Sequence, residues 1–324
     1  MKLLDIIIPF YNQKEEYIIR AISSIIKGIN EDDYNIILIN DGGIGLSQEL
    51  LNKYDKKIIY YSYDKNVGAG MARQYGISVS SSEYITFLDS DDEFISENLN
   101  EVIDCLKNKK PNVLFTDILQ EFKNNGVITT KVKTKDDFFS LHGVFINRDY
   151  LITNNYSFHK ELRLYEDFYF CNVLFLSSRC NHLHINTYLW KYNDNSLTLK
   201  DGDDIYFTSN ISDHYISVKD GYKELKKRKS VAAVDYLVYG IYSMYFVLES
   251  NFFAKAIHND LRNKYEKKLY ELIDRNSEAI SKLPKDRNNY NYQAVKNGYL
   301  ISHPELNVLI SYDEFLLKMK KKYR

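Results

Sequence analysis

Blocks of apolar and polar residues alternate along the first 120 residues, and each block has the length of a strand or a helix. Runs rich in Ile, Leu, Tyr and Phe predict buried strands; they are residues 3–10, 34–42, 57–64, 83–92 and 112–122. Apolar residues spaced three and four apart predict helices between them; these are residues 14–29, 46–55, 69–81 and 96–109. This alternation predicts an α/β fold with a mostly parallel sheet flanked by helices.

The pattern changes after about residue 205, where strand-length runs give way to long helical ones. Residues 235–257 and 259–283 have helical period and are rich in Tyr and Lys. We therefore expect one α/β domain over residues 1–204 and a mostly helical C-terminal module over residues 205–324. The polar segment 200–204 is the expected linker.

Composition indicates an ordinary globular protein. Of the 324 residues, 44% are hydrophobic and 27% charged, and the formal net charge of −1 favours neither nucleic acid nor an anionic membrane as a partner. The longest apolar run, residues 236–248, is shorter than a membrane span of roughly 20 residues. The N-terminal apolar run has no cleavage site after it, so we expect a strand and a cytoplasmic protein. Cys105, Cys171 and Cys180 are expected to be packed hydrophobes.

Polar clusters follow four of the predicted strands. They read PFYN, NDGG, DKNVG and DSDD in chain order. Ligands of open α/β sheets bind beyond the carboxyl ends of the strands, so the clusters are expected to meet in one crevice. Turn formation alone explains the Gly and Asn residues, but not an Asp in every cluster after the first.

The last of these clusters crowds four acids, Asp89, Asp91, Asp92 and Glu93, behind a strand. Like charges repel, and burying any of them costs several kcal/mol unless a positive group compensates. The four acids therefore lie open in water or hold a cation.

Five segments together carry a family resemblance. They are IIIPFYNQKEEYIIRAISSI, ILINDGG, NVGAGMARQYGI, YITFLDSDDEF and LYEDFYFCNVL. In order and spacing they resemble the family 2 nucleotide-sugar glycosyltransferases, over residues 4 to about 200. The resemblance implies a GT-A, Rossmann-like fold and an inverting hexosyl- or N-acetylhexosaminyltransferase. The implied donor is a nucleotide-sugar, most often a UDP-sugar. The implied acceptor is a hydroxyl of a cell-surface polymer, glycan, lipid, protein or modified nucleic acid.

The resemblance also implies which residues bind the donor: Pro9, Phe10, Tyr11, Asn12, Asp41, Asn66, Gly68, Arg73, Asp89, Ser90 and Lys191. Asp41 stands where the family pairs an Asp with the base, and Lys191 where a basic residue meets the diphosphate. Two positions depart from the family pattern. The NDGG cluster lacks the usual Ser after its Gly, and Gln74 replaces a commoner Asn.

A divalent metal is implied by the D-x-D sequence of Asp89 and Asp91. Departure of a nucleoside diphosphate builds negative charge, which a carboxylate-held Mn²⁺ or Mg²⁺ neutralises. Asp92 and Glu93 would support the ligands or face a helix N-terminus. His182 and His184, on a predicted strand, are candidates for a third ligand.

The catalytic pair implied by the resemblance is Glu166 and Asp167. An inverting transfer needs a carboxylate to take the acceptor's proton, which is the role of Asp167, with Glu166 supporting it. A plain acidic pair at a helix N-terminus is the alternative. His142 is expected either to touch sugar or phosphate or to pack, and Trp190 either to stack on a sugar or to join the core.

Two other functions fit parts of the pattern. A non-catalytic nucleotide-sugar-binding or scaffold protein would keep the fold, but it would not need uncompensated acids. A nucleotidyltransferase would be expected to carry a Gly-rich basic loop after the first strand, and PFYNQKEE has no Gly. The helical module is expected to bind the acceptor or to form a homo-oligomer. The basic KMKKKYR end is expected to be solvated or to touch an anionic acceptor or the inner face of a membrane.

Overall fold

The computed structural model describes residues 2–55, 57–124, 126–134, 140–193, 210–249, 259–287, 291, 293–295 and 312–323. The chain divides into two compact units, Met1–Ser196 and Leu197–Arg324. The expected linker at 200–204 lies outside the described residues.

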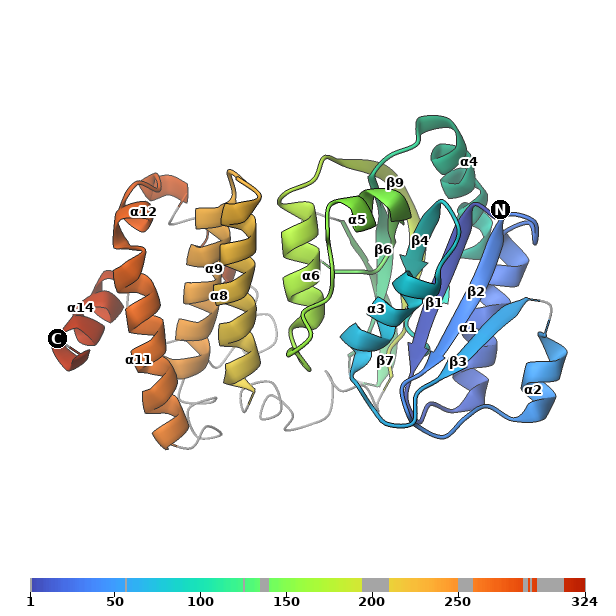
Figure 1. Ribbon diagram of the computed structural model, residues 1–324, viewed down its shortest axis with the longest axis horizontal. Coiled ribbons are helices and arrows are strands. Elements are labelled where there is room, and N and C mark those ends of the chain that lie inside the picture. The colour runs from blue at the N-terminus through green and yellow to red at the C-terminus, as the bar shows by residue number, and fades with distance from the viewer. Residues whose placement is uncertain are drawn as a thin grey trace. The chain divides into compact units, whose positions relative to one another are not determined.

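A single sheet forms the centre of the first unit (Figure 1). Its order is β3-β2-β1-β4-β8-β6-β9-β5, and β7 pairs with β6 outside this path. The strands are β1 (Leu4–Phe10), β2 (Tyr34–Asn40), β3 (Ile58–Ser62), β4 (Tyr84–Phe87), β5 (Glu93–Phe94), β6 (Val113–Asn124), β7 (Val127–Lys133), β8 (Val144–Asn147) and β9 (Cys180–Trp190). Strands β1 to β4 pair in parallel, as do β6 and β9, whereas β5, β7 and β8 pair antiparallel. The predicted mostly parallel sheet is confirmed.

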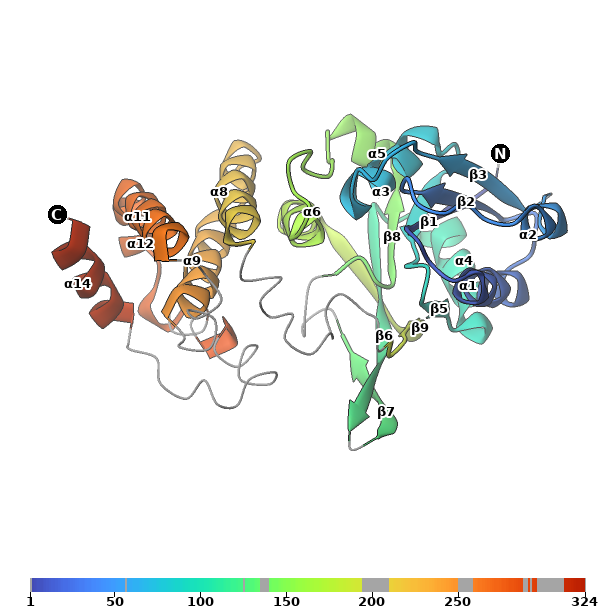
Figure 2. The same ribbon diagram turned by 90° about the horizontal axis from the view of Figure 1, so that it is seen from below.

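Helices cover both faces of this sheet (Figures 1 and 2). They are α1 (Glu15–Gly28), α2 (Gln48–Lys53), α3 (Ala69–Val79), α4 (Leu99–Lys109), α5 (Arg148–Thr153) and α6 (Glu166–Phe175). Helices α1, α2 and α4 pack in one core, and α3, α5 and α6 in the other. Strand β1 serves both cores: Ile6 and Ile8 face the first and Ile7 the second. Burial on both faces explains its uninterrupted apolar run.

Several elements were not predicted as part of the alternating pattern. Strand β7 is exposed and rich in Thr and Lys, and it forms a hairpin with β6 that projects beyond the rest of the sheet (Figure 2). Strands β5 and β8 are too short for a clear hydrophobic period. The predicted strand at 83–92 ends at Phe87, so its acidic residues lie in the loop beyond β4.

The second unit is helical in its described parts, as predicted. Its helices are α8 (Ile211–Lys227), α9 (Ala233–Glu249), α11 (Asn259–Arg275), α12 (Ser277–Ser281) and α14 (Tyr312–Tyr323). The basic end of the chain is not simply a solvated tail. In α14, Lys322 forms an ion pair with the buried Glu266, and the Tyr323 hydroxyl donates to the same carboxylate at 3.0 Å.

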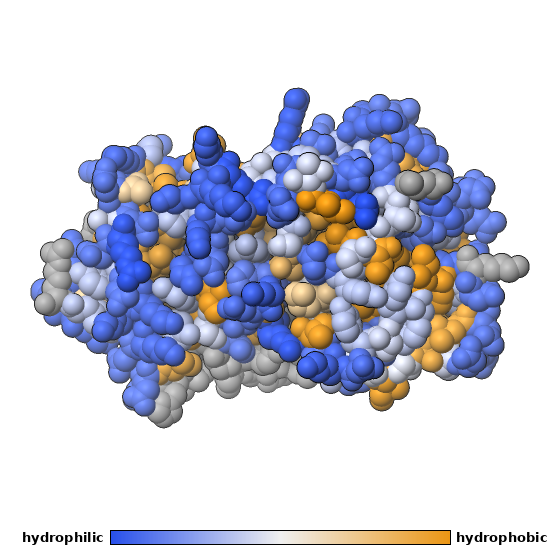
Figure 3. Space-filling model, viewed as in Figure 1, coloured by the Kyte–Doolittle hydropathy of each residue, from blue (hydrophilic) through white to orange (hydrophobic). Residues whose placement is uncertain are grey.

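Surface hydropathy on one face is uneven. Figure 3 shows hydrophobic residues gathered over the region of α3 and its neighbouring strands, with polar residues over most of the rest. No helix in the described part of the chain combines the length and apolar composition needed to cross a bilayer.

A buried carboxylate ties the entrance of β4 to β1 and β2. Asp5 is 1% exposed and accepts hydrogen bonds from Asn35 Nδ2 at 2.7 Å, from the hydroxyls of Ser80 and Ser82, and from the backbone N–H groups of Ser81 and Ser82. Burial alone would raise the pKa of Asp5, but the hydrogen bonds from Ser80, Ser82 and Asn35 outweigh it and lower the pKa below its ordinary value.

Replacing Asp5 by Asn should lower the free energy of unfolding at pH 7 by about 2–4 kcal/mol, because several donors lose a charged acceptor. The wild-type advantage is complete above the unfolded pKa near ~3.9 and is lost as the pH falls through the lower folded pKa. Urea unfolding at pH 7 and pH 3 measures this difference. Asp104→Asn, on an exposed position of α4, is the control. Equal stability of Asp5→Asn and wild type at pH 7 would contradict the assignment.

Candidate active site

The carboxyl ends of β1, β2, β3 and β4 carry the four predicted polar clusters, and the structure joins the second and third clusters through Asp41. Its Oδ1 accepts the Val67 N–H at 2.7 Å, and its Oδ2 accepts the Gly68 N–H and Asn66 Nδ2, both at 2.9 Å. Burial raises the pKa of Asp41, although the two backbone N–H groups act against this. Both carboxylate oxygens thus have partners within the protein, and contact with a donor base stays a prediction.

Two glycines permit close approaches at this edge. Gly42 has φ +74°, and a Cβ there would lie 2.1 Å from the carbonyl carbon of Lys65. A Cβ on Gly70, in the first turn of α3, would lie 2.6 Å from Glu166 Cγ. Only a residue without a side chain lets these segments meet.

The loop after β1 places one aromatic ring in the open. Pro9 and Phe10 are buried in the strand, whereas Tyr11 is 52% exposed. Asn12 has φ +50°, and its Oδ1 accepts the Ile44 N–H at 2.8 Å, which ties this loop to the one after β2. Tyr11 is therefore the aromatic residue of this cluster that offers surface to a ligand.

The loop after β4 holds the four acids, and each has its own set of partners. Asp89 accepts from Arg73 Nη2 at 2.7 Å and lies 3.3 Å from His142 Nε2. Burial would raise its pKa, but Arg73 and His142 hold the pKa of Asp89 well below its usual range. Asp89 is thus a compensated anion. Its neighbour Ser90 is buried and accepts from Gln13 Nε2 at 3.3 Å.

Asp92 is the most buried of the four acids, at 2% exposed. The Tyr188 hydroxyl donates to it at 2.7 Å and the Lys191 N–H at 2.8 Å. Burial, with the charges of Asp89 and Asp91, raises the pKa of Asp92 to about 8, although the charge of His142 acts against this. Tyr188 also accepts the Asp89 N–H at 3.1 Å, so a single hydroxyl joins both ends of the acidic loop.

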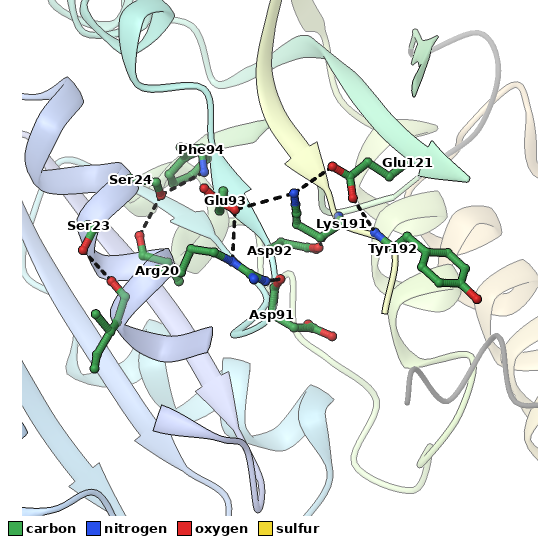
Figure 4. A network of polar contacts seen from close by, with 12 residues as sticks. Arg20, Ser23, Ser24, Asp91, Asp92, Glu93, Phe94, Glu121, Lys191 and Tyr192 are labelled. Atoms are coloured by element: carbon green, nitrogen blue, oxygen red, sulfur yellow. Dashed lines mark hydrogen bonds and ion pairs between the residues drawn. The ribbon is translucent and has the colours of Figure 1, made fainter. Parts of the chain in front are cut away.

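Glu93 takes part in a chain of alternating charges (Figure 4). Arg20 Nε lies 3.0 Å from Glu93 and Lys191 Nζ lies 3.9 Å from it. Lys191 Nζ also lies 2.7 Å from Glu121. The structure therefore directs Lys191 to two carboxylates, and its contact with a diphosphate stays a prediction.

Asp91 differs from Asp89 and Glu93, which form ion pairs with Arg73 and Arg20. Its carboxylate accepts the amide of Asn193 at 2.8 Å. Its main-chain carbonyl accepts Arg20 Nη2 at 2.8 Å, which holds the loop in place (Figure 4). No Lys, Arg or His of the described residues forms an ion pair with the Asp91 carboxylate. Burial and the charge of Asp89 raise its pKa, so this half-buried carboxylate is the one that an added cation would stabilise.

The predicted catalytic pair begins α6, and Arg73 links it to the acidic loop. Arg73 is 7% exposed and reaches Asp89 at 2.7 Å with Nη2 and Glu166 at 3.2 Å with Nη1. Burial and the charge of Asp167 raise the pKa of Glu166 to about 7, despite Arg73. Asp167 is exposed and accepts its neighbour Phe168's N–H at 2.6 Å. The structure thus brings Asp89 and Glu166 together and leaves Asp167 facing solvent.

The predicted aromatic and histidine residues mainly pack. The His142 ring lies 4.7 Å from Tyr188 and 4.9 Å from Trp190 between centroids. Trp190 packs against the core shared with α1 and α4. His182 lies with Asp117 of β6 and His184, rather than in a group with Asp89 or Asp91.

Sequence reasoning missed several residues that hold the acidic loop, namely Arg20, Glu121, Tyr188 and Asn193. They come from α1, β6, and β9 with the segment after it. Arg20, Tyr188 and Asn193 lie 71 to 102 positions along the chain from the aspartates they contact, and Glu121 reaches the loop through Lys191. Arg20, a charge within an apolar helical stretch, is the one local signal that could have found a member of this set.

Comparison with known proteins finds one family. The profile described as Glycosyl transferase family 2 matches residues 5–171, just over half of the 324 residues. The poly(ribitol-phosphate) beta-N-acetylglucosaminyltransferase TarP of Staphylococcus aureus is 24% identical over 338 residues, covering 90% of this chain and 92% of TarP.

Other relatives match over a part of their own length. A teichoic acid poly(glycerol phosphate) polymerase of Staphylococcus epidermidis is 28% identical over 210 residues, which are 62% of this chain. The chain covers 26% of that polymerase and no more than 46% of three further relatives described as glycosyltransferases.

Among solved structures, a crystal structure of S. aureus TarS has a TM-score of 0.66 at 18% identity, over 94% of this chain and 92% of that chain. TarS has also been solved with UDP and with UDP-GlcNAc. The likeness confirms the expected GT-A class of fold.

The raised pKa of Glu166 makes stability depend on pH. Between an unfolded pKa near ~4.3 and the folded value of about 7, the folded protein holds a proton that the unfolded chain has released, so stability falls as the pH rises. Glu166→Gln cannot titrate. Urea unfolding in EDTA should give similar stabilities at pH 5, and a variant more stable than wild type by about 1–3 kcal/mol at pH 8. Identical pH profiles for the two proteins would show that the Glu166 pKa is not raised.

Proposed function

Because this chain belongs to glycosyl transferase family 2, we propose that it transfers a sugar from a UDP-sugar to an acceptor hydroxyl, with inversion and with a divalent metal. The observation that carries the proposal is the Arg73 bridge between Asp89 and Glu166. The single guanidinium of Arg73 contacts one residue implied for donor binding and one implied for catalysis. Residues implied for donor binding that lie beside residues implied for catalysis suit group transfer between two bound substrates.

The site fits the metal that the family implies. Asp91 is a half-buried carboxylate with a raised pKa and an amide neighbour, so its ionised form lacks the compensation that Asp89 and Glu93 receive from arginines. Oxygen ligands with open positions suit Mn²⁺ or Mg²⁺. Asp91 would be the principal ligand and Asp89 the second. A bound metal would neutralise charge on the departing diphosphate.

In this proposal Asp167 acts as the base. Its carboxylate is exposed, and it stands beside Glu166, which Arg73 anchors. The acceptor hydroxyl gives its proton to Asp167 while the hydroxyl oxygen bonds to the anomeric carbon of the sugar. The bond from that carbon to the diphosphate oxygen breaks on the opposite face, which inverts the centre and releases the nucleoside diphosphate.

The different surroundings of Glu166 and Asp167 support different roles for the two acids. Glu166 holds a proton up to about pH 7, because it is buried beside Asp167. Asp167 lies in the first turn of α6 and is exposed, so an acceptor hydroxyl can reach it. The exposed member of the pair is therefore the proposed proton acceptor.

The relatives suggest the substrates. TarS binds UDP and UDP-GlcNAc in its crystals, and TarP carries the name of a poly(ribitol-phosphate) N-acetylglucosaminyltransferase. We therefore propose UDP-GlcNAc as the first donor to test and a phosphate-containing cell-surface polymer as the acceptor. Release of UDP, measured with poly(ribitol phosphate) and poly(glycerol phosphate), with and without EDTA, tests activity, metal and acceptor together. Absence of release with every UDP-sugar would favour a non-catalytic binding protein.

Asp91→Ala should abolish metal-dependent UDP binding, because it removes the carboxylate that lacks an ion-pair partner. Calorimetry of UDP with Mn²⁺ measures this, with Asp104→Ala on an exposed face of α4 as the control. Affinity for UDP and Mn²⁺ that is the same in Asp91→Ala and wild type would exclude Asp91 as the ligand.

Asp167→Asn keeps the size of the side chain but cannot accept a proton at neutral pH. The rate constant kcat and the ratio kcat/KM should fall together by roughly 10²-fold or more, the usual contribution of a positioned base. UDP binding should be unchanged, since Asp91 and Asp41 lie on other loops. Exposed Glu161→Gln, on the segment before α6, is the matched control. Loss of UDP binding with a normal rate would show that Asp167 has another role.

A further inference from the structure

Three potential metal ligands that the proposed reaction does not use meet between β6 and β9. His182 Nε2 lies 2.7 Å from Asp117 Oδ1, and His184 Nδ1 lies 3.7 Å from Asp117 Oδ2. The two imidazole centroids are 3.9 Å apart. One ligand atom from each residue lies within 4.8 Å of the other two.

The local backbone explains how the three side chains come together. Residues two apart on a strand face the same side, which places both histidines on one face of β9. The pairing of β6 with β9 shifts twice at Asp117, from Thr116 opposite Leu183 to Asp117 opposite Asn186. The extra residues of β9 form a bulge-like irregularity, and such irregularities change the direction in which side chains point. It displaces His184 from the ladder and leaves its imidazole beside the carboxylate of the neighbouring strand.

A hydrogen bond explains why the Asp117 and His182 side chains lie together, without any metal. Both side chains are nearly buried, at 12% and 13% exposed, and 2.7 Å is an ordinary hydrogen-bond distance. It does not account for His184, whose side chain is 76% exposed yet lies against both partners. A cation shared by all three would hold the third side chain in this position.

We propose that Asp117, His182 and His184 form a second metal site, selective for Zn²⁺ and similar borderline ions. Two imidazole nitrogens and one carboxylate oxygen are a ligand set that Zn²⁺ takes at about 2.0–2.2 Å, with a fourth position left for water. Mg²⁺ and Ca²⁺ prefer oxygen ligands throughout. The exposed side of His184 gives an ion a path to the site. The chain thus has an oxygen-only candidate site at Asp91 and a nitrogen-rich one at Asp117.

The position of the site suggests its role. Beyond the histidines, β9 and the three residues after it include Tyr188, Lys191 and Asn193, which contact Asp92 and Asp91. An ion bound across β6 and β9 would hold the strands together at the irregular pairing just before these residues. The bound ion therefore stabilises β9, the strand that positions the acidic loop. This structural role does not depend on the proposed sugar transfer.

Metal titration of the untagged full-length chain tests the site. After EDTA treatment and dialysis into excess Mg²⁺, wild type should bind one Zn²⁺ in competition with a chromogenic chelator. Co²⁺ at the same site should give the visible absorption of a low-coordinate nitrogen-containing site. Each of His184→Ala and His182→Gln should weaken Zn²⁺ binding by roughly tenfold or more. Zn²⁺ should raise the thermal unfolding midpoint of wild type by about 3 °C or more, but not that of His184→Ala.

Two controls decide between this site and others. Asp91→Ala should keep the Zn²⁺ affinity of wild type, and so should His159→Ala, which removes a histidine of the same unit outside the cluster. Because His184 is exposed, its replacement leaves the fold intact, and circular dichroism checks this. Unchanged Zn²⁺ affinity in His184→Ala, or loss of the Zn²⁺ site in Asp91→Ala, would overturn the proposal.

Discussion

Charge compensation of the acidic loop after β4 is the constraint on which the rest of the first unit depends. Four acids in five residues cannot be packed beside a buried strand unless positive groups and donors surround them. The chain brings these groups from α1, α3, and β9 with the residues after it, so helices and strands distant in sequence are fixed by one loop. Each partner is shared: Arg73 serves two acids, Tyr188 serves both ends of the loop, and Lys191 lies between two glutamates.

Because their partners differ, the four acids have different roles. Asp89 is ionised and fixed, Asp92 is buried and prefers its proton, and Glu93 belongs to a surface chain of charges. Asp91 is held in place through its backbone by Arg20, while its carboxylate receives an amide only. A rigid backbone with an under-compensated side chain is the arrangement expected of a preorganised cation ligand.

Much of the fold followed from hydrophobic period alone, because the parallel strands are buried on both faces and their helices are amphipathic. The antiparallel strands β7 and β8 were missed because one is exposed and polar and the other has four residues. The strand-end acids and the Glu166–Asp167 pair were visible as charges in apolar surroundings. Their partners were not, because the contact of Asp92 with Tyr188 joins residues 96 positions apart. The packing of His142 and the grouping of His182 with Asp117 likewise depend on strand pairing, which a single sequence does not specify.

The shared guanidinium of Arg73 also limits how such a site can be rebuilt. Helix α6 begins with the acid that Arg73 anchors, while α3 carries the arginine itself, and Gly70 lets the two meet without an intervening side chain. A segment taken from a relative with a different acceptor would bring a new first turn to this contact. The contact with the first turn of α6 would be kept only if α3 had an equally buried arginine and a nearby glycine. Exchange of α6 within this architecture therefore requires grafting α3 and α6 as a matched pair, although they are far apart in the chain.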